Sequence, residues 1–198
     1  MKACQLAKGF CLFIVGLSTA TAGPNLIING SFELGFSGWQ GTWGYYDQSP
    51  NPVSGTRVGV LVDISHSSVG QTMYQQIPTT PGLTYEINFA LRLPDLMEVS
   101  PGIFIPVVGD SNGGSTTISL RIDESPIASI PVTSRAAWNF YTYNFTATQS
   151  STKVNFFNPS SLAWPFIDDV TVTVVSEPQP AALFGLAIVV LAAFRLKQ

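Results

Sequence analysis

The sequence predicts an all-β protein in which one jelly-roll β-sandwich lies between two terminal segments. Three observations support this fold class. Apolar and polar residues alternate over several short stretches, no stretch of the body keeps a helical period, and clusters of Gly, Pro, Asn and Ser separate the stretches. Residues 23–175 are numerous enough to form one domain with its own core. The order of the strands stays open.

The clearest predicted strand is 83–93, where every second residue is apolar and the residues between are mostly polar. Further strands are expected at 26–28, 39–46, 57–63, 73–77, 116–122, 127–132, 140–147, 152–157 and 166–175. A long connection, 94–114, contains the apolar run 103–108. We interpret this run as a lid over one sheet or a contact patch for a partner, and 110–113 as a hairpin turn.

The first residues have the features of a signal peptide. Lys2 and Lys8 give a basic region, residues 9–17 are an apolar stretch, and Ala20-Thr21-Ala22 supplies small residues for cleavage. The apolar stretch is too short for a permanent anchor. We therefore predict a signal peptide at 1–22 and a mature chain that begins at Gly23.

The last residues, 176–198, predict a sorting or anchor segment. The polar turn Ser176-Glu177-Pro178-Gln179-Pro180 precedes an apolar helix at 181–194, and Arg195 and Lys197 follow it. This helix would reach about 21 Å, which is shorter than the roughly 30 Å hydrocarbon core of a bilayer. We expect a chain exported across the inner membrane, held there by the helix at least transiently, and then located at the cell surface or outside the cell.

Composition excludes several kinds of site. Both cysteines, Cys4 and Cys11, lie in the leader, so the mature chain has no disulfide and no thiolate ligand. The body is more acidic than the whole chain, whose formal net charge is −3, because the terminal segments hold four of the nine basic residues but only one of the twelve acidic ones. No basic stripe is present, and nucleic acid is therefore not expected as a partner.

An enzyme is not expected. His66 is the only histidine and lies in a polar stretch, and no Gly-x-Ser-x-Gly sequence is present. Several carboxylates are available for glycoside hydrolysis, but none forms a recognisable pair. We therefore predict a non-catalytic protein.

Several sequence pieces resemble known families. The opening Asn25-Leu26-Ile27-Ile28-Asn29-Gly30-Ser31-Phe32-Glu33, then Gly38-Trp39, and the closing Ile167-Asp168-Asp169-Val170 resemble carbohydrate-binding modules with a galactose-binding-like fold. The tail resembles the PEP-CTERM sorting signal, which exosortases read, and the residues at the corresponding positions are Ser176, Glu177, Pro178 and Arg195. It differs from that signal in having Ser176 where a proline is usual.

The first resemblance implies a structural calcium ion where the first and last strands lie side by side. Its ligands would be Glu33 and Asp168 or Asp169, with backbone carbonyls near Gly30 and Gly55. Ca²⁺ binds six to eight oxygen ligands in irregular geometry, which suits such a set. The alternative is that Glu33 caps a turn and that the two aspartates are solvated.

Sugar recognition in such sandwiches usually requires exposed aromatic rings beside polar groups. Trp39 and Trp138 match positions that pack in the core of the family. Trp43, Tyr45, Tyr46 and Trp164 are the candidate ligand-binding rings, with rings folded back onto the sandwich edge as the alternative.

Two functions from different classes follow. The first is a calcium-stabilised, surface- or matrix-associated module that binds extracellular polysaccharide and is processed by an exosortase-type enzyme. The second is a structural protein of the extracellular matrix with no small-ligand site. An enzyme that acts on glycans is a weaker third.

Overall fold

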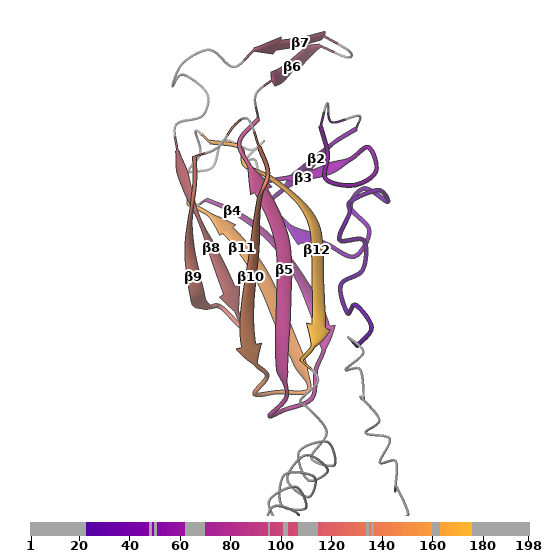
Figure 1. Cartoon of the computed structure of the whole chain (residues 1–198), viewed down its shortest axis with the longest axis vertical. Coiled ribbons are helices and arrows are strands. Elements are labelled where there is room, and N and C mark those ends of the chain that lie inside the picture. The colour runs from indigo at the N-terminus through magenta and orange to yellow at the C-terminus, as the bar shows by residue number, and fades with distance from the viewer. Residues whose placement is uncertain are drawn as a thin grey trace, which may run out of the picture. The chain divides into compact units, whose positions relative to one another are not determined.

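Two antiparallel sheets pack face to face in the computed structural model of the chain (Figure 1). The structure describes residues 23–47, 49, 51–61, 70–94, 96–100, 103–106, 115–133, 135, 137–159 and 163–175. The strand order is β1-β4-β11-β8-β9 in one sheet, here called sheet A, and β10-β5-β12-β3-β2 in the other, sheet B. Successive strands mostly alternate between the sheets, as they do in a jelly roll. The predicted all-β sandwich is confirmed.

The strands of sheet A are β1 (Gln40–Gly41), β4 (Gln71–Pro78), β11 (Ser151–Asn158), β8 (Thr116–Ile122) and β9 (Ser125–Val132). Those of sheet B are β10 (Asn139–Thr146), β5 (Thr84–Arg92), β12 (Phe166–Val174), β3 (Val58–Val60) and β2 (Gly44–Tyr46). A separate two-stranded hairpin consists of β6 (Leu96–Ser100) and β7 (Ile103–Pro106).

The core lies between the sheets and follows the alternation in the sequence. The residues that β5 contributes to this core are Tyr85, Ile87, Phe89 and Leu91, and those of β8 are Ile118, Leu120 and Ile122. Trp39 and Phe156 pack against each other in this core, with ring centroids 6.4 Å apart. Because successive strand residues point to opposite faces, each strand contributes every second side chain to this core.

The region before β3 differs from its predicted form. The expected strand at 39–46 is two short strands, β1 and β2, which belong to different sheets. Gly41 has φ +113°, and a Cβ there would stand 2.1 Å from the Thr72 carbonyl oxygen. Only glycine allows the chain to leave sheet A at this close approach and cross to sheet B. Residues 26–28 do not form a regular strand.

The opening segment nevertheless lies along the last strand, as the family resemblance implies. The Leu26 amide donates to the Val172 carbonyl at 2.8 Å, and the Val170 amide donates to the Gly30 carbonyl at 3.0 Å. The pairing of β12 with β5 shifts between Asp168 and Thr171, and Asp169 has φ +55°. This β-bulge changes the direction of the Asp168 and Asp169 side chains, at the place where the opening segment runs along the last strand.

Part of the long connection at 94–114 forms the hairpin of β6 and β7 (Figure 1). Sequence periodicity did not predict this hairpin. Residues 107–114, including the expected turn at 110–113, lie outside the described residues. So do the signal peptide at 1–22 and the segment 176–198. Within the described part of the chain, no helix is both long enough and apolar enough to cross a bilayer.

Candidate functional site

Trp43 was a candidate for an exposed ligand-binding ring, with a ring folded back onto the sandwich edge as the alternative, and the structure shows a buried ring. Its side chain is only 5% exposed, and its ring lies edge-on to Phe32 and Phe36 at centroid distances of 5.7 and 4.9 Å. The residues around Trp43 are polar and glycine-rich, which suggested a surface loop. The chain instead turns the ring inward between β1 and β2, where burial of a large apolar surface stabilises the sandwich edge.

Tyr45 and Tyr46 lie in β2, opposite Gly59 and Val58 of β3. The Tyr45 ring is half-buried, with Phe36 at 4.9 Å and the guanidinium carbon of Arg57 at 5.5 Å from its centroid. Both contacts hold the ring against its neighbours. The side chain of Tyr46 lies outside the described residues.

Trp164 precedes β12 and is half-buried against a small cluster of Val58, Val60 and Phe166. Trp43 belongs instead to the main core. Trp39 is in the core as predicted. Trp138 was also expected in the core, but it is only partly buried against the same small cluster as Trp164, and its Nε1 donates to the Asn51 carbonyl at 2.8 Å. The described rings of the predicted set therefore do not form one exposed group.

A different set of side chains gathers on the outer face of sheet A. Residues directly opposite each other in neighbouring antiparallel strands share a face. Asn155 in β11 is opposite Tyr74 in β4 on one side and Arg121 in β8 on the other. These three residues form one row across the middle of the sheet.

Neighbouring rows carry the other members of this outer face. Phe157 is opposite Thr72 and Ser119, and Lys153 is opposite Gln76. Their alternation with the buried Val154 and Phe156 places Lys153, Asn155 and Phe157 on the side away from the core.

Two cations lie against the rings of this face. The Lys153 Nζ stands 3.8 Å from the centroid of Tyr74, and the Arg121 Cζ stands 3.9 Å from the centroid of Phe157. Both pairs are diagonal neighbours on adjacent strands, which side chains of this length can bridge. Cation–π contacts of this kind contribute about 0.5–1 kcal/mol at exposed sites.

Asn155 lies between these pairs and is only 1% exposed. Its Nδ2 donates to Glu124 Oε2 at 3.2 Å, while its Oδ1 has no hydrogen-bond partner. Glu124 also pairs with Lys153, and the hydrogen bond from that ammonium group holds the pKa of Glu124 below its usual range. A buried acceptor without a donor costs free energy, so this oxygen is an unsatisfied polar group on the outer face of sheet A.

Sequence reasoning missed this face. The alternation in 72–76 and 153–157 does place these rings and polar groups on outward positions. Their proximity, however, depends on β4 and β8 both pairing with β11, and periodicity within one strand carries no information about its neighbours.

The predicted acidic residues gather around the loop 51–57. Glu33 Oε1 accepts hydrogen bonds from the amides of Thr56 and Arg57 at 2.9 and 2.8 Å, and its Oε2 accepts one from the Thr56 hydroxyl at 3.1 Å. Desolvation opposes ionisation, but these donors and the charge of Arg57 together lower the pKa of Glu33. Gly55, at φ +61°, leaves room for this carboxylate, since a Cβ there would stand 2.3 Å from Glu33 Cδ.

Asp168 holds the other side of the same loop. Its Oδ2 accepts from the amides of Val53 and Ser54 at 2.8 and 3.1 Å, and its Oδ1 accepts from the amide of Asp169 at 2.7 Å. The side chain is fully buried, and this desolvation raises its pKa to about 6 despite the three amide donors. Asp169 is exposed and accepts from the Ser54 hydroxyl at 2.8 Å.

Carboxylate oxygens, which Ca²⁺ prefers, lie around this loop, but amides of the loop already donate to Glu33 and Asp168. Glu33 and Asp168 bind one loop from two sides, and Asp168 is a buried carboxylate that lacks a cation partner in the described residues. Those residues contain no group of three or more His, Cys, Asp or Glu side chains that could hold a metal ion. Ca²⁺ would draw further ligands from backbone carbonyls such as those near Gly30 and Gly55, or from water. The calcium ion stays a prediction.

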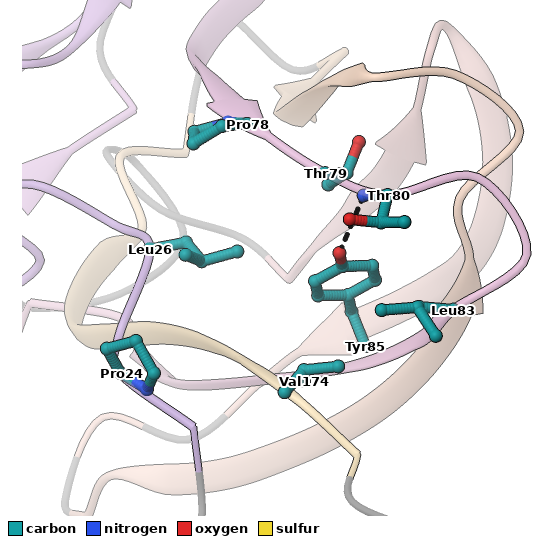
Figure 2. Close-up of a pocket in the computed structure, with 8 residues that line it drawn as sticks. All are labelled: Pro24, Leu26, Pro78, Thr79, Thr80, Leu83, Tyr85 and Val174. Atoms are coloured by element: carbon teal, nitrogen blue, oxygen red, sulfur yellow. Dashed lines mark hydrogen bonds between the residues drawn. The ribbon is translucent and has the colours of Figure 1, made fainter.

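An apolar hollow of about 360 Å³ lies at the end of the sandwich where β4 leads into β5 (Figure 2). Within it, the Tyr85 hydroxyl accepts a hydrogen bond from the Thr80 amide at 2.8 Å. The hollow is lined by Pro24, Leu26, Pro78, Thr79, Thr80, Leu83, Tyr85 and Val174. None of the sequence-predicted site residues lines it.

Comparisons with known proteins address the fold. No protein-family model matches the sequence, and no curated protein matches it. Solved structures do. The chain resembles the CBM22-1 xylan-binding domain of Paenibacillus barcinonensis Xyn10C with a TM-score of 0.57 and 14% identity, over 81% of this chain and 100% of that one. It resembles TmCBM61, solved in complex with β-1,4-galactotriose, with a TM-score of 0.51 and 16% identity, over 77% of this chain and 100% of that one.

The fold is that of a carbohydrate-binding-module sandwich. A third match shows that the same fold has other uses. The Stig cyclase Fisc from Fischerella sp. TAU, in complex with an indole compound, matches with a TM-score of 0.57 and 15% identity, over 81% of this chain and 100% of that one. The fold alone therefore does not determine the function, which depends on the residues of the site.

Proposed function

We propose that this protein is a non-catalytic module that binds polysaccharide on the outer face of sheet A. The observation that carries the proposal is the row of Tyr74, Asn155 and Arg121, in which an aromatic ring, a buried amide oxygen without a donor and a guanidinium group lie side by side. Sugar sites combine aromatic surfaces with a few polar groups that fix the orientation of the ligand.

The two rings of this face have a spacing that suits a chain. Tyr74 lies in β4 and Phe157 lies in β11, two residues beyond the partner of Tyr74. Such diagonal neighbours are about 7–8 Å apart in a sheet. One extended glycan would contact both rings, with Asn155 between them. The hydroxyls of Thr72 and Ser119 add donors and acceptors beside Phe157.

The solved structures support a polysaccharide ligand. Two of the matching folds are described as a xylan-binding domain and as a galactotriose complex. A catalytic role has less support, because the carboxylates of Glu33 and Asp168 are engaged by backbone amides of one loop and do not face each other across a cleft.

Removal of one aromatic ring from each sheet tests the proposal. A glycan array screened with the protein identifies the strongest ligand, and calorimetry then measures its affinity for Phe157→Ala and Phe140→Ala. Phe140 is the matched control, since it is 72% exposed on the outer face of sheet B. We expect about a tenfold loss of affinity in Phe157→Ala and no change in Phe140→Ala. Equal losses, or a loss only in Phe140→Ala, would refute this location.

A protein that binds none of the arrayed glycans would favour the structural alternative, a stable sandwich of the extracellular matrix. The melting curve of the same sample decides whether the blank comes from a folded protein. A cooperative transition with no binding would remove the proposed function.

Export and sorting form a further part of the proposal. The residues at 1–22 and 176–198 support a signal peptide and a sorting segment on sequence grounds. We expect mass spectrometry of the protein from its native cell to find an N-terminus at Gly23 and no residues 181–194. An intact C-terminus would mean a tail anchor in place of exosortase processing.

A further inference from the structure

Arg121 stands apart from the other basic residues of the domain. Lys153 pairs with Glu124, and Arg57 pairs with Asp47 and donates to the Glu33 carbonyl. Arg92 is fully buried, and Arg135 donates to the Pro94 carbonyl at 2.8 Å. Arg121 forms no ion pair with any described residue. Its charge contributes to the lowered pKa of Glu124 without direct contact.

The contacts of Arg121 leave most of its donors unused. Its Nε lies 3.4 Å from Ser119 Oγ, and its Cζ lies over the Phe157 ring. Neither terminal nitrogen donates a hydrogen bond to a described residue. A guanidinium group presents five N–H donors in a rigid plane, which match the two oxygens of a carboxylate. The ring of Phe157 and the backbone of β8 fix where those donors stand.

Asn155 supplies the complementary group next to Arg121. Its unpartnered Oδ1 requires a donor, and a sugar hydroxyl is one. A ligand that satisfies both residues carries an anionic acceptor for Arg121 and a hydroxyl for Asn155, close together on one unit. Uronic acid residues of a polysaccharide have this combination, whereas neutral sugars offer Arg121 only hydroxyl oxygens.

We propose, on the basis of the proposed function above, that the outer face of sheet A selects glycans that contain uronate residues. Arg121 binds the carboxylate, Asn155 accepts from a ring hydroxyl, and Tyr74 and Phe157 contact the faces of the sugars. A sugar that displaces Arg121 from the Phe157 ring removes the cation–π contact between them. A neutral sugar does not compensate for this loss, whereas a carboxylate does so through charge-assisted hydrogen bonds to Arg121.

The charges around this site define the ligand further. The chain as a whole is acidic, with a formal net charge of −3, so it does not adsorb polyanions through its general field. Glu124 lies beside the site and already neutralises Lys153. A second carboxylate placed next to Glu124 would be repelled. The site therefore suits a uronate whose carboxylate reaches Arg121 while the carboxylates of the neighbouring units lie away from Glu124.

A matched pair of ligands tests the inference. Calorimetry is run on the full chain with hexagalacturonate and with the same hexamer after reduction of its carboxyl groups, and a glycan array adds alginate, hyaluronate and neutral xylan. The proteins are the native chain, Arg121→Gln, and Thr142→Glu, which makes the same change in net charge on the exposed outer face of sheet B.

We expect at least one uronate glycan to bind about tenfold or more tightly than its reduced form or the neutral polymers. Arg121→Gln should remove this difference, and Thr142→Glu should keep it. Equal or tighter binding of neutral glycans would overturn the uronate inference and leave the proposed function in place. A difference that survives Arg121→Gln would also overturn it. A folded protein that binds neither class would refute the proposed function itself.

Discussion

The outer faces of the two sheets have the same strand geometry and opposite chemistry. On sheet B, Thr142 in β10 donates to Asn88 Oδ1 in β5 at 2.6 Å, and Asn88 Nδ2 donates to Glu86 at 3.0 Å. On sheet A, the corresponding amide, Asn155, leaves its oxygen without a donor. The first face satisfies its own hydrogen bonds and the second does not. A polar group without a partner in the protein, such as Asn155 Oδ1, favours the binding of a ligand that supplies the missing hydrogen bond.

The aromatic residues separate the two faces in the same way. In β10, Tyr141 and Tyr143 stack on Phe89 at 5.6 and 6.1 Å and so belong to the core side. On sheet A, Tyr74 and Phe157 point outward and carry cations on their faces. Apart from the exposed Phe140, these rings of sheet B therefore serve stability, while sheet A displays two rings that lie next to unsatisfied and charged polar groups.

The largest effect we expect concerns the buried carboxylate at the start of β12 in sheet B. The pKa of Asp168 is raised in the folded protein, so folding favours its protonated form. Stability from this group is full below the unfolded value of about 3.8 and is lost as the pH rises through about 6. The difference between pH 4 and pH 7.5 is about 2 kcal/mol.

Thermal melts from pH 5 to pH 7.5 should show a falling transition temperature for the native chain and a flatter profile for Asp168→Asn. His66 is present in both proteins and cancels in this comparison. If calcium binds here, adding it at pH 7.5 should raise the melting temperature of the native chain only. A chelator without effect would count against the ion, and parallel pH profiles would show that Asp168 is not the group responsible.

A smaller effect follows from the same substitution on each face. Asn155→Leu removes an unsatisfied oxygen, so we expect unchanged or slightly higher stability together with weaker glycan binding. Asn88→Leu breaks a closed set of hydrogen bonds and should cost about 1 kcal/mol with no change in binding. Urea unfolding of both variants measures the change in the free energy of unfolding and its sign. Equal stability losses would mean that Asn155 is already satisfied, and the contrast between the faces would fail.

The smallest effect concerns the ion pair that borders the site. Glu124→Gln should change the free energy of unfolding by less than about 1 kcal/mol, because the Glu124 side chain is 56% exposed and solvent screens the pair. The variant should also bind uronate glycans more tightly, since the neighbouring negative charge is gone. Tighter binding that persists at high salt would indicate a cause other than this charge.

The sequence predicted more of the fold than of the site. Alternation identified 116–122 to the residue and placed 84–92, 139–146 and 166–174 within one or two residues of their ends. It failed at 39–46, where Gly41 lets the chain change sheets, and at the hairpin within 94–114. Local patterns report which side of a strand is buried and carry no information about a change of sheet.

For the site, the family resemblance named Glu33 and Asp168, whose carboxylates accept hydrogen bonds from amides of the same loop, while their role as calcium ligands stays a prediction. It did not find Arg121, Asn155 and Phe157, which come together only through strand order. It also took a glycine-rich context as a sign that Trp43 is exposed, although the same glycines allow the ring to fold inward.

The most direct test of the binding face is an NMR titration of the isotope-labelled chain with hexagalacturonate, and in parallel with xylohexaose and β-1,4-galactotriose. The account predicts that whichever ligand binds will shift amide signals of 72–76, 119–121 and 153–157, while those of 84–90 and 140–146 stay in place. Shifts confined to sheet B, or to the hollow lined by Leu26, Leu83 and Val174, would contradict it.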